Sequence, residues 1–453
     1  MAGSATDISA FEAATWRKLM WHLVPLLFLG YFVAYLDRVN VGFAKLQMAS
    51  DLRFSDTVFG FGAGIFFIGY FLFELPSNLI LAKVGARRWM ARITITWSLA
   101  SAAFIFTGAI AWGPVARLFG CTDAEFSFYV LRFLLGVAEA GFVPGAMLYL
   151  TYWFPAARRA QVAALFFIAI PLANALGSPL SGAILQFLNG LHGLRGWQWL
   201  FLIEALPSLL VGFFILAMLP DRPQVARWLN ADERAMIVQR LDADAARKAG
   251  QDERSRIADI FADWRVWALA LADFCRGTYA NAITFWMPTI VQEVGIGKKA
   301  YLAIGLLAMI PASVGAVAMV VVARHSDSTG ERRWHAVLSS LVAAVGLVLL
   351  AFAGHEPVLS MIALALIAGG GLAWLAVFWT LPTAFLSGTA AAGGIAWINA
   401  LAMLSGYVGP DTLGRIRGAN AGEDTTAFLL LAVFAVVCAG LTYVLTGTRA
   451  VRS

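Results

Sequence analysis

Two pairs of ionisable side chains interrupt otherwise apolar stretches of the sequence. Asp37 and Arg38 follow eight residues that are apolar, aromatic or glycine. Arg132 and Glu139 lie seven positions apart in a second apolar stretch. A guanidinium can replace the hydration of a carboxylate by a bidentate, charge-assisted pair. A partly desolvated acid can take up a proton. These residue types predict a site in which the two arginines attract a carboxylate and the two acids carry protons.

Helix geometry decides how these four charges can be used. Adjacent helical residues point about 100° apart, so Asp37 and Arg38 each need a partner on another element. Arg132 and Glu139 are expected on one helix face, about 10 Å apart along the axis. If the two helices face each other, the four charges would line one cavity. The alternative is that they form buried ion pairs that fix helix register or lock a gate.

The composition places these charges in a membrane. Of 453 residues, 60% are hydrophobic and 13% are charged, against about 25% charged residues in soluble proteins. Apolar runs of about 20 residues recur along the whole chain, which indicates an all-α integral membrane protein. The polar N-terminal stretch does not resemble a cleavable signal peptide.

The cysteines, the histidines and the absence of catalytic motifs in the sequence argue against several other classes of protein. The three cysteines and five histidines are scattered, so we expect no disulfide framework, no metal and no cofactor besides the coupling proton. Neither a phosphate-binding loop nor a nucleophile–base pair is present, and we therefore expect no enzyme activity. The net charge of +6 is explained by membrane orientation rather than by nucleic acid.

Twelve spans are predicted, separated into two sets of six by one long polar segment. They cover about 18–44, 56–82, 89–112, 126–152, 158–189, 197–219, 265–293, 299–324, 334–354, 357–381, 385–413 and 424–447. This pattern predicts an N-terminal six-helix bundle over 1–219, a linker over 220–264 with a short amphipathic helix, and a C-terminal six-helix bundle over 265–453.

The basic residues predict the orientation. Of the 33 lysines and arginines, 22 fall on the side of the termini and the linker, 8 fall on the opposite side, and Arg38, Arg132 and Arg276 lie inside spans. By the positive-inside rule, both termini and the linker are cytoplasmic.

The two halves repeat one loop sequence. AKVGARRWMARI at 82–93 follows the second span, and HSDSTGERRWHAVL at 325–338 follows the eighth. Both loops resemble the signature of the major facilitator superfamily, whose plan is two six-helix bundles related as parallel repeats. The matching residues, expected to have gating or structural roles, are Lys83, Gly85, Arg87, Arg88, Asp327, Gly330, Arg332 and Arg333. The first copy has Ala82 where the family has an acid, which weakens one expected latch.

Within the superfamily the chain resembles the anion:cation symporter branch, which includes bacterial tartrate, phthalate and hexonate transporters and vesicular glutamate and phosphate transporters. The residues that carry this resemblance are YLDRVN at 35–40, FELPSN at 73–78, LRFLLGVAEAGFVPG at 131–145, YWFPAARRA at 152–160 and INA at 398–400. In the branch, residues matching Asp37 and Glu139 couple protons, and residues matching Arg38 and Arg132 bind the anion.

Two further positions match substrate contacts of the branch. Tyr70 matches a tyrosine that touches substrate, although aromatic packing also explains it. Asn399 matches an asparagine that hydrogen-bonds substrate, although a contact with another helix is the alternative. Glu74, beside Pro76, could instead satisfy backbone groups freed at the kink.

Arg276 is the third basic residue inside a span. It lies three residues after Asp273, so a local salt bridge is the first interpretation. The alternative is that Arg276 binds a second carboxylate, which a diacid would supply.

The resemblance implies a proton-coupled symporter that imports an organic anion, such as tartrate, phthalate or a sugar acid, across the bacterial inner membrane by alternating access. The expected partners are the anion, protons and the lipid bilayer, and a monomer is expected to be the functional unit. A drug or sugar transporter of the same fold, working as an exporter or antiporter, is the alternative.

Overall fold

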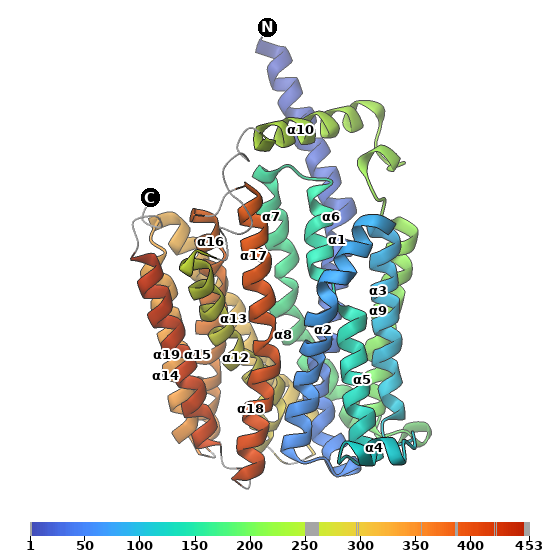
Figure 1. Ribbon diagram of the computed structural model, residues 1–453, viewed down its shortest axis with the longest axis vertical. Coiled ribbons are helices and arrows are strands. Elements are labelled where there is room, and N and C mark those ends of the chain that lie inside the picture. The colour runs from blue at the N-terminus through green and yellow to red at the C-terminus, as the bar shows by residue number, and fades with distance from the viewer. Residues whose placement is uncertain are drawn as a thin grey trace.

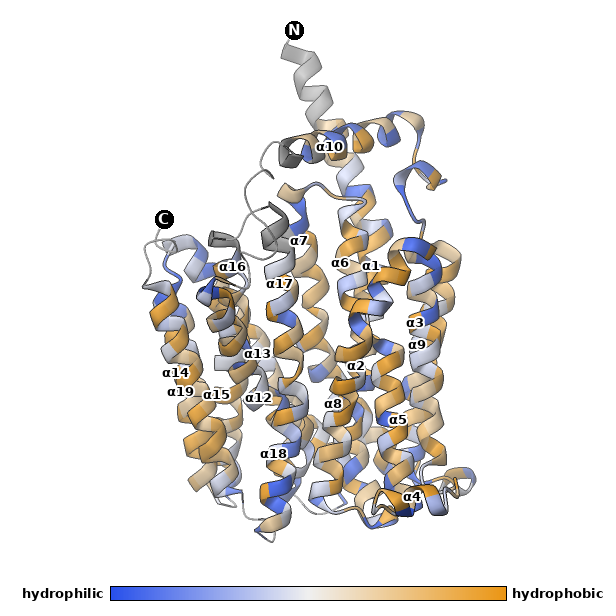
Figure 2. Ribbon diagram, in the orientation of Figure 1, coloured by the Kyte–Doolittle hydropathy of each residue, from blue (hydrophilic) through white to orange (hydrophobic). Residues whose placement is uncertain are grey.

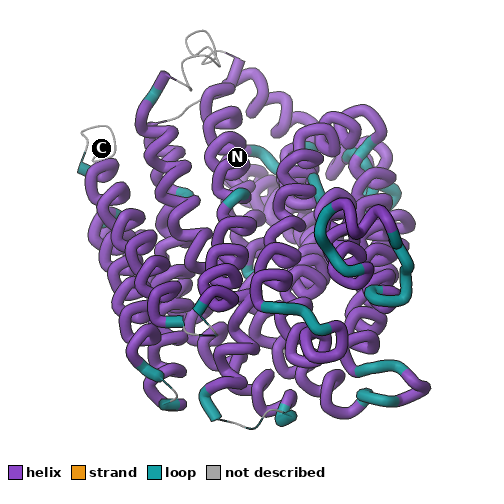
Figure 3. The backbone as a smooth tube through the Cα atoms, turned by 60° about the horizontal axis from the view of Figure 1, so that its bottom comes forward, coloured by secondary structure: helices purple, strands orange, loops and turns teal. Residues whose placement is uncertain are grey.

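The computed structural model describes residues 2–249 and 262–447, apart from 296, 298, 355, 386, 387, 421 and 423. Throughout these residues the regular structure is helical (Figure 3). The N-terminal half contains α1 (Ala2–Leu52), α2 (Asp56–Val84), α3 (Ala86–Ala102), η1 (Ala103–Phe106), α4 (Pro114–Leu118), α5 (Asp123–Glu139), α6 (Phe142–Thr151), α7 (Ala156–Phe167), α8 (Ala169–Phe187), η2 (Leu191–Gly193) and α9 (Gly196–Met218). The linker contains η3 (Pro223–Val225) and α10 (Ala231–Ala249). The C-terminal half contains α12 (Trp264–Glu293), α13 (Tyr301–Thr329), α14 (Arg333–Phe352), α15 (Pro357–Phe378), α16 (Thr380–Phe385), α17 (Gly388–Met403), α18 (Ser405–Ala419) and α19 (Thr425–Thr446).

The helices form two six-helix bundles, as the sequence predicts. In the described part of the chain, ten helical segments are long and apolar enough to cross a membrane. The seventh and eleventh positions are filled by α12, which carries Asp273 and Arg276, and by the interrupted pair α17 and α18. Apolar residues cover the middle of the bundle, and polar residues gather at its two ends and on α10 (Figure 2). Helix α1 begins and α19 ends at the same end of the bundle (Figure 1).

Several predicted spans differ from the observed helices in their limits. The first helix begins at Ala2 rather than near residue 18, and the third span ends at Phe106 rather than at 112. Gly108, with a φ of 92°, turns the chain just after that span. The amphipathic linker helix is present as α10, and residues 250–261 lie outside the described residues. The exact domain limits stay predictions.

The fourth span is broken in the middle. Helix α5 ends at Glu139, and Gly141 then adopts the left-handed conformation with a φ of 89° before α6 begins. A Cβ on Gly141 would lie 2.4 Å from the Ser77 Oγ atom of α2, so no larger residue fits there. The break places the Glu139 carboxylate at a helix C-terminus inside the bundle.

The two halves meet closely at the end of the bundle that is opposite the termini. Helix α2 packs against α18, α8 against α13 and α1 against α12. A Cβ on Gly60 would lie 2.6 Å from the Pro410 carbonyl oxygen, and one on Gly182 would lie 2.3 Å from the Tyr301 carbonyl oxygen. These approaches let the backbones of the two halves touch, so this end of the molecule is closed.

Candidate functional site

A buried ion pair between Arg38 and Glu139 lies at the centre of the N-terminal half. The Arg38 guanidinium on α1 donates from Nη2 to Glu139 Oε1 on α5. Their side chains are only 8% and 1% exposed. Within the described part of the chain, Arg38 Nε and Glu139 Oε2 have no hydrogen-bond partner. Since buried polar atoms are normally paired, each member of this pair retains unused capacity for a ligand.

Aromatic rings surround the Arg38 guanidinium. Its central carbon lies 5.3 to 5.9 Å from the ring centroids of Tyr35, Phe66, Phe67 and Tyr70. Such rings attract a cation through their faces and exclude water from it. The ion pair is therefore held in a low-dielectric environment, where electrostatic interactions are strong. Tyr70 contributes to this environment and is 2% exposed.

The chain break after α5 adds to the electrostatics of this pair. Glu139 is the last residue of α5, where the negative end of the helix dipole adds to the charge of the carboxylate. The Arg38 cation stabilises both charges. Removal of Arg38 from the pair, by a competing anion, would leave Glu139 without this compensation.

Arg132 lies near the ion pair without forming a hydrogen bond to it: the guanidinium carbons of Arg132 and Arg38 lie 4.9 and 5.3 Å from the Phe66 ring centroid. It donates from Nε to the Gly62 carbonyl oxygen at 3.2 Å and from Nη2 to the Ala63 carbonyl oxygen at 2.9 Å, both on α2. Its Nη1 atom is buried without a partner. The guanidinium also faces the Phe285 ring of α12 at 5.8 Å. Arg132 is thus fully buried, paired with backbone, and close to the C-terminal half.

Asp37 does not join the other three charges, contrary to the expectation of one cavity lined by all four. Its Oδ1 atom accepts from Ser101 at 2.8 Å, and its Oδ2 atom accepts from Ser208 at 2.5 Å and from the Trp97 ring at 3.2 Å. These donors belong to α3 and α9. The turn of about 100° between adjacent helical residues sends Asp37 and Arg38 to different surfaces of α1.

Glu204 on α9 is a buried acid that the sequence reasoning missed. It is 0% exposed, and its Oε1 atom accepts from Ser181 of α8 at 2.6 Å. The signal was available, because Glu204 is the only charged residue in the predicted span 197–219.

Asn399 and Glu74 connect the two halves. The Asn399 amide on α17 donates to Glu74 Oε1 on α2 at 3.5 Å. The Glu74 Oε2 atom is buried and has no partner among the residues that the structure describes. The alternative foreseen for Asn399, a contact with another helix, is therefore present in this structure.

Arg276 forms the local salt bridge that its spacing predicts. Its Nε atom lies 2.8 Å from Asp273 Oδ1 on the same helix, and its guanidinium lies 5.9 Å from the Trp374 ring centroid. Tyr35 lies within electrostatic reach of both Arg276 and Arg38. The Tyr35 ring centroid lies 5.5 Å from the Arg38 guanidinium carbon.

The first signature loop obtains its acid from elsewhere in the chain. The Asp221 carboxylate, just after α9, accepts from the Arg87 backbone N–H at 2.8 Å, and Arg87 Nε donates to the Leu216 carbonyl oxygen at 2.6 Å. Asp221 also fills the space beside Gly85, which has a φ of 98°. The latch expected to be weak because of Ala82 is thus built with a distant aspartate. Of the other signature residues, Lys83 and Arg88 are exposed.

The second loop uses its own acids. Arg332 pairs with Asp327 at 3.3 Å, Gly330 ends α13 in the left-handed conformation, and the Arg333 guanidinium stacks on Tyr443 at 3.8 Å. Burial favours a raised pKa for Glu331, but hydrogen bonds from the Trp334 backbone N–H and from His335 outweigh it and hold this pKa below its ordinary value.

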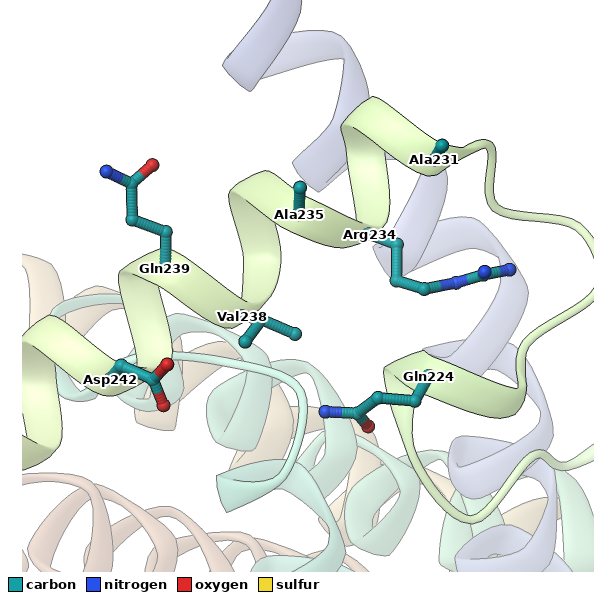
Figure 4. A pocket seen from close by; sticks show the side chains of 7 residues that line it. All are labelled: Gln224, Ala231, Arg234, Ala235, Val238, Gln239 and Asp242. Atoms are coloured by element: carbon teal, nitrogen blue, oxygen red, sulfur yellow. The ribbon is translucent and has the colours of Figure 1, made fainter.

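A surface hollow of about 560 Å³ lies on the linker, away from the buried charges. Figure 4 shows its lining side chains on α10 and the preceding turn: Gln224, Ala231, Arg234, Ala235, Val238, Gln239 and Asp242. None of the buried ionisable residues of the bundle borders it. The candidate site is therefore the group of charges within the membrane spans.

Comparison with known proteins agrees with this architecture. The family model described as "Major Facilitator Superfamily" matches residues 27–422. The chain belongs to the Major Facilitator Superfamily. This transporter is thus a multi-pass membrane protein and not an enzyme, as its sequence predicts.

Two of its relatives have names that indicate different substrates. A protein named "Putative tartrate transporter" from Agrobacterium vitis is 49% identical over 442 residues, which is 97% of this chain and 96% of the relative. A protein named "Quinolone resistance transporter" from Acinetobacter baumannii is 38% identical over 409 residues, which is 90% of this chain and 89% of the relative.

A solved structure shows the same fold. The crystal structure titled "Crystal structure of D-xylose-proton symporter" superposes with a TM-score of 0.73 at 16% identity, over 94% of this chain and 97% of that chain.

Proposed function

We propose that this transporter imports an organic anion together with protons, by alternating access across the bacterial inner membrane. The observation that carries the proposal is the Arg38–Glu139 pair, which is buried among aromatic rings and keeps unpaired atoms on both members. A guanidinium in such an environment favours a carboxylate ligand over a neutral one. The relative named as a putative tartrate transporter supports a carboxylate as the substrate.

The pair offers a simple coupling step. A substrate carboxylate that binds Arg38 displaces Glu139, which is then a buried anion without a cation. A buried, unpaired carboxylate is strongly disfavoured and takes up a proton instead. Anion and proton therefore bind together, because binding of the anion alone would leave Glu139 ionised, buried and without a cation.

Arg276 is proposed as the second anchor for the substrate. Arg38 belongs to the N-terminal half and Arg276 to the C-terminal half, and the Tyr35 ring lies 5.5 Å from the Arg38 guanidinium carbon. A dicarboxylate that reached both would exchange Asp273 for its second carboxylate and bridge the two halves. Tyr70 and Asn399, near the same centre, would provide polar contacts to hydroxyl groups of a sugar acid.

The orientation and the unit of function are also proposed. The bias of basic residues toward the end that carries α10 and the termini supports a cytoplasmic location for that end. The opposite end, which is closed in this structure, would then face outward. A monomer holds all the proposed residues within one chain and would be sufficient.

The test is uptake by purified protein in proteoliposomes under an imposed pH gradient. The panel contains tartrate, phthalate, a hexonate, a neutral sugar and a fluoroquinolone. We expect pH-driven uptake of at least one carboxylate, and Glu139→Gln should retain carboxylate exchange while losing pH-driven accumulation. If the protein took up the neutral sugar but none of the carboxylates, an organic anion would be excluded as its substrate class.

Drug export is the second candidate, because one relative is named as a quinolone resistance transporter. A fluoroquinolone that carries a carboxylate could also meet Arg38. Proton-driven efflux of the fluoroquinolone, with no movement of tartrate, phthalate or hexonate, would favour this candidate.

A further inference from the structure

A second buried polar cluster lies inside the N-terminal half, on the side of α1 that faces away from the Arg38–Glu139 pair. It gathers side chains from four helices, each at most 2% exposed: Asp37, Asn40, Trp97, Ser101, Ser181, Glu204 and Ser208. Asp37 and Asn40 are three apart on α1, and Glu204 and Ser208 are four apart on α9. Each of these pairs therefore presents one helix face to the other helix.

The two acids of this cluster are hydrogen-bonded differently. Both oxygens of Asp37 accept hydrogen bonds, from Ser101, Ser208 and Trp97. Among the described residues, Glu204 accepts a close hydrogen bond only through Oε1, from Ser181, and its Oε2 atom is buried with no close donor. Three donors are the arrangement that suits an ionised carboxylate, whereas the second oxygen of Glu204 has no donor in place.

No cation offsets these two acids. Among the described residues, neither Asp37 nor Glu204 forms an ion pair. The helices packed against α9 are α1, α3 and α8, together with η1. Helix α8 and η1 carry no titratable side chain, and α3 carries only its three arginines. These are Arg87, Arg88 and Arg92, near the start of α3, where Arg92 stacks on Trp89.

The charges carried by α1 and α5 do not compensate the pair either. On α1, Asp37 places a second negative charge near Glu204, while Arg38 pairs with Glu139 instead. Glu139 on α5 acts on Asp37 as a further negative charge. Two carboxylates that are buried together without a cation cannot both stay ionised, so they hold a proton between them.

Asn40 fits the role of a partner for an acid that changes its protonation state. It is 1% exposed and lies near enough to Glu204 for a weak side-chain interaction, while neither its amide nitrogen nor its amide oxygen makes a close hydrogen bond to any described residue. A protonated Glu204 could donate to the amide oxygen, and an ionised Glu204 could accept from the amide nitrogen. An unpaired buried amide is costly unless a group of this kind uses it.

We propose that Glu204, with Asp37 and Asn40, forms a proton-binding site separate from the Arg38–Glu139 pair, and that Glu204 is the residue that holds the proton. The proton binds the Glu204 carboxylate to give the neutral acid, and Asp37 remains the anion held by its three donors. The inference rests on the proposed function, because the cluster would supply a second proton to the transport cycle. Asp37 and Arg38 are adjacent in sequence, so a shift of α1 on substrate binding moves both sites together.

The transport test compares Glu204→Gln, which mimics the neutral acid, with Ser98→Ala. Ser98 lies on the same α3–α9 interface, where it donates to the Ala205 carbonyl oxygen at 2.8 Å without contact to either acid. We expect Glu204→Gln to keep carboxylate exchange but to lose at least tenfold in pH-driven accumulation. Ser98→Ala should retain both activities. Unchanged pH-driven accumulation in Glu204→Gln would overturn the proposal, and so would accumulation driven by a sodium gradient in the absence of a pH gradient.

A spectroscopic measurement keeps the inference testable if Glu204→Gln does not fold. Infrared spectra of the Glu74→Gln/Glu139→Gln protein, labelled with ¹³C at the glutamate side chains, should show a buried protonated carboxyl band that shifts with the label. A band that shifts only with labelled aspartate, or no such band, would overturn the assignment to Glu204. Because this readout needs no substrate, it separates a failure of the inference from a failure of the proposed function, which wild-type uptake tests.

Discussion

The closed end of the molecule contains a charge network whose removal should shift the transport equilibrium. Arg417 on α18 is 4% exposed and contacts Asp56 at 3.1 Å, Glu293 at 2.5 Å and Asp424. Asp56 belongs to α2, whereas the other two acids belong to the C-terminal half. Lys45 of α1 also binds Asp56, at 2.8 Å. Asp56 is therefore the acid through which this network joins the two halves.

The perturbation is Asp56→Asn, which removes the charge and keeps the shape. Arg417 is buried, but the Asp56 side chain is 27% exposed. An exposed ion pair contributes about 0.2–1 kcal/mol, and breaking a buried pair costs about 3–5 kcal/mol. The free energy lost in Asp56→Asn should lie between these two values. A loss of about 1–2 kcal/mol shifts the equilibrium between the closed and open forms of this end by about 5- to 30-fold.

The assay is the rate at which a maleimide that cannot cross membranes labels a Thr57→Cys reporter in a Cys121→Ser background. Thr57 packs against α18 here, because a Cβ on Gly418 would lie 2.3 Å from its Oγ1 atom. Thr57 is half-buried in this structure, so a sulfur at this position becomes more accessible when the halves separate. We expect Asp56→Asn to raise the labelling rate by about 5- to 30-fold.

The matched control is Asp51→Asn. Asp51 lies at the same end, but its partners Trp197 and Arg195 belong to its own half, with contacts at 2.9 and 3.3 Å. Asp51→Asn should leave the labelling rate unchanged. If Asp56→Asn labelled no faster than the wild type, or if both variants labelled equally fast, the network would not hold this end closed.

Three further predictions concern the site and its supports. Arg38→Lys should reduce carboxylate transport by at least tenfold while the protein stays folded, because an ammonium lacks the planar fork of the guanidinium; equal exchange rates in proteoliposomes would contradict this. Gly141→Ala should cost about 1–3 kcal/mol, seen as a lower Tm in detergent, because its φ is 89° and Ser77 leaves no space. The control Gly190→Ala has a similar φ of 88° with nothing within 4 Å, so a loss as large as that of Gly141→Ala would point to backbone strain alone. Arg276→Gln should raise the KM for a dicarboxylate more than that for a monocarboxylate; an equal change for both substrates would leave only the salt bridge with Asp273 as its role.

Local patterns were sufficient for the helices and for the charges inside them. Hydropathy over about 20 residues depends only on neighbouring residues, so the twelve spans and the repeated loops could be read directly. Helix geometry also showed that Asp37 and Arg38 must point to different surfaces. The spacing of three between Asp273 and Arg276 was enough to predict their salt bridge.

Limits of helices were less predictable where single residues interrupt a long apolar run. The break after Glu139 depends on Gly141 and on the close approach of Ser77 from another helix. A glycine inside an apolar run is compatible with an unbroken helix, so the sequence alone did not place this break. The tertiary contact decides that the chain turns there.

The sequence by itself determined that the protein is a twelve-span transporter with rare charges inside its spans, because membrane burial restricts composition locally. The sequence did not determine how those charges pair with one another. Arg38 meets Glu139 across 101 positions of sequence, Asp221 replaces the acid missing at position 82, and Ser208 of α9 binds Asp37 of α1. Each of these partnerships depends on which helix faces which, and only the packing of the helices fixes that.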